Sequence, residues 1–124
     1  FDIPNFFAKV EMDDVIYPLA KGAYSWTEKS LFGERTVTTD HASPNQQAEE
    51  MEAIVVSKGA EVKVSIESEP ELTVFMWTDK GKEKKIAMKE NSFNVVSDQG
   101  VYVYEIVATW EQGYRSYVLK IEVQ

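Results

Sequence analysis

The sequence predicts an all-β fold, an antiparallel two-sheet sandwich of about seven to nine strands with at most one short helix. The first observation is the stretch 98–123, where two alternating segments flank a turn at Gly113 and form a hairpin that needs a larger sheet around it. The second is a series of short alternating segments at roughly ten-residue spacing, with turn residues between them. The third is that helix signals occur only in 43–51.

Length and composition indicate one domain with an aromatic core. The chain has 124 residues, of which 44% are apolar, and it contains 3 Trp, 6 Tyr and 6 Phe. A chain of this size buries most of its unfolded surface without disulfides. So many rings argue against disorder, because they supply large apolar side chains for an interior. We therefore expect a single domain over 1–124.

The charge balance disfavours two classes of partner. The 21 acidic and 13 basic residues give a net charge of −8. Such a surface repels the phosphates of nucleic acids and anionic lipid headgroups. Solubility alone also explains this charge.

The absence of cysteine removes another set of chemistries. Without cysteine there is no disulfide framework, no thiolate nucleophile and no thiolate metal site. The sequence contains no apolar run long enough to span a membrane and no signal peptide. Because it begins at Phe1, we expect that a leader has been removed or that a longer protein precedes this residue.

The first 52 residues predict short strands, one loop and a helical turn. Segment 1–17 reads as two short strands around an acidic turn, and a third strand is expected over 22–26. Segment 27–40 reads as a loop followed by a short edge strand, because it contains Gly33 and then a β-branched run over 36–39. Ser43, Pro44 and Gln46 form a capping-box pattern that predicts a short surface helix ending near residue 51.

From residue 53 onward the pattern is β throughout. The clearest half-buried strand is 62–66, where apolar and polar residues alternate. Segment 72–77 is apolar on both faces, which favours a central strand. The remaining expected strands are 54–56, 86–88, 93–96 and the two arms of the closing hairpin.

Four segments resemble strands of immunoglobulin-like domains: 59–66, 74–77, 98–104 and 117–123 are similar to strands B, C, F and G. Asp98, Gly100 and Tyr102 have the spacing of the turn and tyrosine corner that opens strand F, in which the tyrosine is buried and its hydroxyl bonds to backbone upstream.

The resemblance has consequences for the whole chain. It implies an immunoglobulin-like strand set in 53–124, preceded by N-terminal strands and loops in 1–52. It also implies that Trp77 is the core tryptophan of strand C, and that Ile66 and Tyr104 pack together where antibody domains have paired cysteines.

The chain also resembles an uncharacterised group of small cell-envelope lipoproteins of Bacillus-type Gram-positive bacteria. The resemblance covers roughly residues 10–124 and rests on three features. They are Gly22, Tyr24 and Trp26; the pair Ser43 and Pro44; and the run from Gly100 and Tyr102 to Trp110, Gly113 and Tyr117. It implies an extracytoplasmic protein, secreted or lipid-anchored, with a signal peptide and an attachment cysteine upstream of Phe1.

Catalytic and metal signals are weak. His41 is the only histidine, and Asp40 and Ser43 beside it on one loop rarely give the geometry of a triad. Carboxylates that could gather a calcium ion occur in three groups, but none has EF-hand spacing. These groups are Asp13 and Asp14; Glu49, Glu50 and Glu52; and Glu67, Glu69 and Glu71. We expect no catalytic residue, no metal site and no cofactor.

Aromatic residues near turns are the binding candidates. Tyr24, Trp26, Trp110 and Tyr114 could stack on a sugar, a peptide or a partner surface, although Trp26 and Trp110 also suit a core. The sequence favours a non-catalytic module that binds an unknown protein, peptide or cell-wall ligand. The alternative is a small envelope hydrolase that uses carboxylates or His41.

Overall fold

The computed structural model describes residues 6–39, 42–81 and 83–124, and within them the fold is all-β with one short helix, as predicted. The elements are β1 (Ala8–Met12), β2 (Val15–Pro18), β3 (Ala20–Ser30), β4 (Gly33–Thr39), α1 (Pro44–Glu49), β5 (Ile54–Val56), β6 (Glu61–Ile66), β7 (Glu71–Trp77), β8 (Glu83–Ile86), β9 (Ser92–Asn94), β10 (Gly100–Trp110) and β11 (Gly113–Val123). The described ranges contain eleven strands, more than the seven to nine expected, and four of the eleven have only three or four residues.

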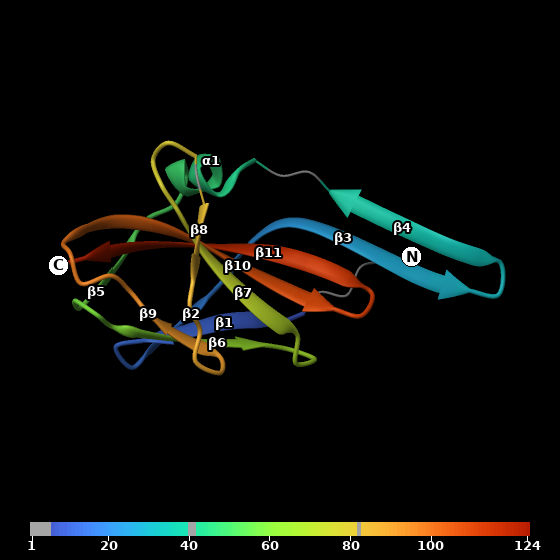
Figure 1. The fold of residues 1–124 in the computed structure, drawn as a ribbon, viewed down its shortest axis with the longest axis horizontal. Helices are drawn as coiled ribbons and strands as arrows, with labels where there is room; N and C mark the ends of the chain where they lie inside the picture. Colours follow the sequence, from blue (N-terminus) through green and yellow to red (C-terminus); the bar gives the residue numbers. More distant parts are fainter. Residues whose placement is uncertain (1–5, 40–41, 82) are drawn as a thin grey trace.

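The strands form two sheets that pack face to face (Figure 1). The smaller sheet has the order β2-β1-β6-β9, and the larger has the order β4-β3-β11-β10-β7-β8 with β5 also paired to β11. The β5–β11 pair is parallel, whereas the other strand pairs are antiparallel. The neighbours β1-β6-β9 and β7-β10-β11 match strands A-B-E and C-F-G of the immunoglobulin fold.

The core lies between the two sheets and is centred on the closing hairpin. β10 and β11 pair along their whole length, from Gly100 opposite Val123 to Trp110 opposite Gly113. Alternate residues of both strands face the smaller sheet and are buried, as the period-two pattern predicts. They include Tyr104, Ile106, Ala108, Tyr117, Leu119, Ile121 and Val123, which meet Val10, Val62 and Val64 of the smaller sheet in one cluster.

Trp77 does not occupy the core position that the immunoglobulin resemblance implies. It pairs with Val103, whereas Met76 pairs with the fully buried Tyr104. Since neighbouring residues of a strand face opposite sides of a sheet, Trp77 lies on the outer face. There its Nε1 donates to a carboxylate oxygen of Glu105 at 3.1 Å. The expectation of a core tryptophan was therefore wrong by one residue of register.

The two residues expected to replace a disulfide both contribute to the core. Tyr104 is fully buried and its ring packs against Phe93 at 5.2 Å, while Ile66 is partly buried against the same cluster. The Tyr104 hydroxyl accepts a hydrogen bond from the backbone N–H of Val96 at 3.4 Å.

The start of β10 contains the expected backbone bond of Tyr102. The Tyr102 hydroxyl donates to the carbonyl oxygen of Asp98 at 2.9 Å. Gly100 has φ +153°, and a Cβ there would stand 3.3 Å from the Tyr102 hydroxyl oxygen. Only glycine adopts this backbone conformation readily. Tyr102 is half-buried, whereas the sequence predicts a buried side chain, because it sits at the end of the sandwich beside the exposed Val101.

Replacing Tyr102 by phenylalanine should lower the free energy of unfolding by about 0.5–1.5 kcal/mol, since water can reach the freed Asp98 carbonyl. Gly100→Val should cost more, about 1–3 kcal/mol, because valine cannot adopt the positive φ without strain. Urea denaturation of both variants shows which of them loses more unfolding free energy. A Tyr102→Phe variant as damaging as Gly100→Val would contradict it.

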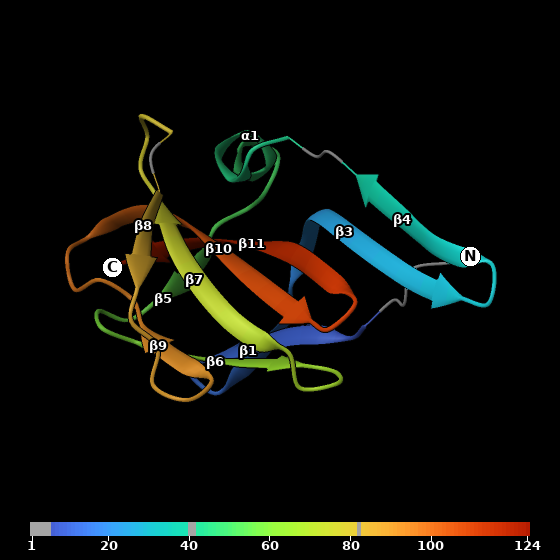
Figure 2. The same cartoon turned by 45° about the vertical axis from the view of Figure 1, so that its right-hand side comes forward.

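Helix α1 lies on the outer face of the larger sheet, over β10 and β11 (Figure 2). The predicted capping box is present, since Ser43 Oγ accepts from the Gln46 N–H at 3.3 Å and Gln46 Oε1 accepts from the Ser43 N–H at 3.0 Å. Lys120 Nζ donates to the carbonyls of Ala48 and Met51 at 3.0 and 3.1 Å, which fixes the carboxyl end of the helix to β11.

Candidate functional site

The β3–β4 hairpin projects beyond the sandwich and is the most distinctive feature of the surface (Figure 1). β3 pairs with β11 only from Ala20 to Trp26, and the last backbone bond to the body joins Thr27 N to Gln112 O at 2.8 Å. Beyond that point β3 pairs only with β4, as far as Ser30 opposite Gly33. Among the described strands, the outer part of the hairpin is therefore a two-stranded ribbon without a third strand.

Polar pairs across the ribbon hold its two strands together. Glu28 lies opposite Arg35 in the register, and Lys29 Nζ lies 3.7 Å from a carboxylate oxygen of Glu34. Nearer the body, the hydroxyls of Thr27 and Thr36 are 2.7 Å apart. Opposite charges and paired threonines are favourable cross-strand neighbours. The two acids and two bases of the ribbon cancel, so the ribbon is electrically neutral on a protein of net charge −8.

The tip of the hairpin consists of Leu31 and Phe32, each 99% exposed. Ser30 shapes the turn, since its hydroxyl donates to the Gly33 carbonyl at 3.2 Å and accepts from the Phe32 N–H at 3.2 Å. Gly33 follows with φ +122°. The turn is thus built by serine and glycine, and neither apolar side chain contributes to it.

Three aromatic rings fix the base of the hairpin to the body. Trp26 is 6% exposed and lies 5.8 Å from the ring of Phe6 and 5.8 Å from that of Trp110. Phe6 stacks on Trp110 at 4.5 Å, and Trp110 Nε1 donates to the Glu67 carbonyl at 3.3 Å. This cluster joins β3, β10 and the segment before β1, so it sets the direction in which the ribbon leaves the body.

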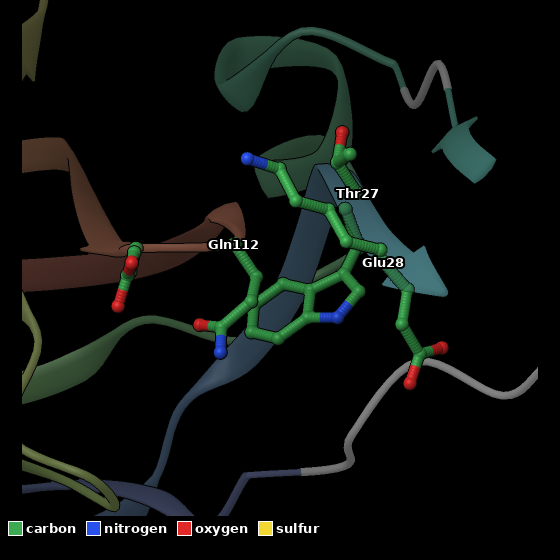
Figure 3. A pocket seen from close by; sticks show the side chains of 6 residues that line it. Thr27, Glu28 and Gln112 are labelled. Atoms are coloured by element: carbon green, nitrogen blue, oxygen red, sulfur yellow. The ribbon is translucent and has the colours of Figure 1, made fainter. Parts of the chain in front are cut away.

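A shallow hollow of about 380 Å³ lies where the ribbon leaves the body. Thr27 and Glu28 of β3 lie on one side of it and Gln112 of the β10–β11 turn on the other (Figure 3). Trp26, Lys29 and Glu111 complete the lining. Its carboxylates, ammonium and amide can contact polar groups of a macromolecule that sits against the base of the hairpin.

The four aromatic candidates divide between two faces of the sheet. Trp26 and Trp110 meet in the cluster at the hairpin base, and the Tyr24 ring lies 4.9 Å from the Arg115 guanidinium. Tyr114 is 40% exposed and pairs with Ser25, so it faces the opposite side from Trp26. The structure therefore does not bring the four together into one aromatic surface.

The metal candidates do not converge within the described residues, and two of the three catalytic candidates lie outside them. His41 and Asp40 lie outside those residues, so the structure describes no triad geometry for them. In the described ranges no three acidic or histidine side chains converge in a way that could hold a metal ion. Asp13 instead accepts from the backbone N–H and the hydroxyl of Ser57 at 3.0 and 3.2 Å.

Two tyrosines have perturbed acidities, and both lie in the core. Burial raises the pKa of Tyr104, opposed by the Val96 N–H that donates to its oxygen. Burial also raises the pKa of Tyr117, opposed by the nearby Arg115 guanidinium. Both side chains are protonated at neutral pH and serve as large core groups.

Comparison with known proteins leaves the hairpin as the main guide to function. No protein-family model, curated protein or solved structure matches the chain. Among the described residues, no helix is long and apolar enough to cross a membrane.

Sequence reasoning missed the tip, because 27–40 was expected to begin with a loop. The signal was present as Leu31 and Phe32 directly before Gly33, between two short charged segments. Two large apolar residues at a turn position indicate either a packed loop or a contact surface, and only the structure separates the two readings.

Proposed function

We propose that this protein is a non-catalytic binding module that engages a protein partner through the β3–β4 hairpin, with Leu31 and Phe32 inserted into an apolar pocket of that partner. The observation that carries the proposal is the 99% exposure of both side chains at the tip of a projecting ribbon. The tip groups are hydrocarbon and offer no acid, base or nucleophile, which favours binding over catalysis.

The tip residues have no role in folding that would account for them. Two-residue hairpin loops favour asparagine, aspartate and glycine, since these residues suit the backbone and the solvent. A leucine and a phenylalanine there expose apolar surface and gain nothing within the chain. Residues that depart from the preference of their turn, and gain no contact within the chain in return, are typical of functional positions.

Burial of the tip in a partner would contribute substantially to affinity. Fully burying a leucine or phenylalanine side chain is worth roughly 1.5–3 kcal/mol. Binding through the ribbon costs little conformational entropy, because cross-strand pairs already order the ribbon in the free protein. Two anchors on a preordered ribbon therefore act as the centre of an interface.

A protein pocket suits this tip better than a membrane or a wall polymer. A single myristoyl chain gives only marginal membrane binding, and the tip offers less hydrocarbon than that on a protein of net charge −8. A polysaccharide favours several flat aromatic faces beside hydrogen-bonding groups, whereas Phe32 is the only ring at the tip.

We also propose that the partner is met outside the cytoplasm, with the protein secreted or lipid-anchored. This location rests on the resemblance to small cell-envelope lipoproteins alone.

Replacing both tip residues, Leu31→Ser with Phe32→Ser, should weaken binding to the partner at least 100-fold, because two anchors are lost together. The purified protein, immobilised on beads, is used to capture partners from an envelope extract. The affinity of each purified captured protein is then measured by calorimetry for the wild type and the double variant.

The matched control is Val15→Ser with Ile16→Ser, which removes another exposed apolar pair, 47% and 57% exposed, on β2. This variant should bind like the wild type. Equal affinities for the wild type and the tip variant would rule out the hairpin as the contact.

A further inference from the structure

β4 presents an open edge of the larger sheet. One side of β4 pairs with β3, and on the other side no described strand pairs with it. Exposed edges are normally protected by proline, bulges or repeated charge. The opposite edge strand, β8, is protected in this way, since Glu83, Lys84 and Lys85 are consecutive and exposed. β4 has no proline, and its exposed charges are the single pair Glu34 and Arg35, which are opposite in sign and can therefore pair with the same edge of a second copy.

We propose that a second copy of this chain pairs with this edge, β4 against β4 in antiparallel register about a two-fold axis between Glu34 and Arg35. The inference goes beyond the proposed function, because it concerns the edge of β4 and not a pocket that receives both tip residues. In this register Glu34 of each copy lies opposite Arg35 of the other. The contact is self-complementary, so it closes as a dimer.

The existing pairs of the hairpin extend this complementarity across four strands. Within one copy Lys29 lies opposite Glu34 and Glu28 lies opposite Arg35. In the dimer, four side chains lie side by side across one face of the sheet: Lys29 and Glu34 of one copy, then Arg35 and Glu28 of the other. Their charges alternate in sign. The two-fold axis places an identical set of four side chains on the opposite face. Cross-strand neighbours of opposite charge stabilise a sheet, whereas like charges destabilise it.

The same register covers part of the exposed tip. Beyond the end of β4, this register brings the turn residue Phe32 of one copy near Val37 of the other, which lies opposite Trp26 in its own hairpin. Val37 is half-buried, and Phe32 is 99% exposed in the single chain. Pairing therefore brings an exposed ring beside an apolar side chain near the aromatic cluster of the second copy.

Charge repulsion between the two bodies does not prevent this contact. Each tip reaches the base of the other hairpin, so the bodies lie at opposite ends of the paired strands. The seven residues of β4 span roughly 20–25 Å. That distance is well beyond the screening length of about 8 Å at physiological salt. The neutral ribbon thus holds two acidic bodies apart.

Sedimentation velocity on the full chain and on charge variants tests the register. The wild type should sediment with twice its chain mass of 14.1 kDa. Glu34→Arg alone and Arg35→Glu alone should each dimerise at least tenfold more weakly, because each places like charges opposite one another on both sides of the axis. An equimolar mixture of the two variants should recover the dimer, since both arginines of the Glu34→Arg chain then face the two glutamates of the Arg35→Glu chain.

Recovery in the mixture separates this register from simple damage to the hairpin, which mixing would not repair. Glu83→Arg and Lys84→Glu make the same kinds of charge change on β8 and should dimerise like the wild type. A wild type that is monomeric at every accessible concentration, or a mixture that stays monomeric, overturns the pairing. The proposed function would survive that result if tip-dependent binding to another protein were found, and it fails separately if that binding does not depend on the tip.

Discussion

Replacing Gly113 by alanine is expected to destabilise the protein by about 3 kcal/mol or more, because the new methyl group has nowhere to go. A Cβ at Gly113 would overlap the carbonyl oxygen of Ser25 and stand 2.9 Å from the Cα of Trp26. These are backbone atoms of β3, which pairs with Gly113 at this point. They cannot move aside as a flexible side chain would, so β3 must separate from β11 where the hairpin leaves the body.

Urea denaturation measures the loss, and binding to a tip-dependent partner measures its functional consequence. Gly22→Ala is the matched control, since a Cβ there would stand 3.3 Å from its nearest neighbours, the backbone and hydroxyl oxygens of Ser116. Gly22 also lies in β3, so the control separates the Gly113 contact from a general effect of alanine at the junction of β3 and β11. Equal losses of unfolding free energy in the two variants would refute the backbone overlap.

Most of the sandwich could be predicted because its strands obey local rules. The alternation in 62–66 and in the first arm of the closing hairpin survives in the structure as one buried face on each strand, whereas the second arm is buried on both faces over 116–119, where α1 covers it. The short helix was predictable from Ser43 and Gln46, whose reciprocal bonds depend only on residues three apart. The position of Trp77 was not, since a strand apolar on both faces does not indicate which face meets the core.

The candidate site was harder to predict, because the exposure of its tip depends on tertiary contacts that the local sequence does not indicate. Thr27 to Ser30 contain two charges and no alternation, so their sequence resembles a loop, yet they pair with β4 through polar cross-strand contacts. In a turn that folded back on the body, Leu31 and Phe32 could pack against it and would indicate no binding surface. Their significance comes from the projection of the ribbon, which is set by the tertiary contacts of Trp26 and Gly113.

Trp26→Ala should cost about 3–5 kcal/mol, the range for removing a large buried aromatic side chain. Trp26 is 6% exposed and contacts both other rings of the cluster, so its loss leaves a cavity between β3, β10 and the segment before β1. The ribbon then loses its fixed direction, because the remaining attachment is the strand pairing with β11. We expect a tip-dependent partner to bind more weakly even where the variant stays folded. The ribbon must then lose conformational entropy when it binds, and this cost reduces the affinity.

Trp26→Phe and Trp77→Ala test whether this effect belongs to the cluster. Phenylalanine keeps a ring beside Phe6 and Trp110, so Trp26→Phe should retain most of the binding affinity and lose less stability than the alanine variant. Trp77→Ala removes the same side chain from the outer face, where it is half-buried, and should cost less than Trp26→Ala without affecting the tip. If Trp77→Ala weakened partner binding as much as Trp26→Ala, the outer face of the sheet would be the contact surface and the hairpin would not.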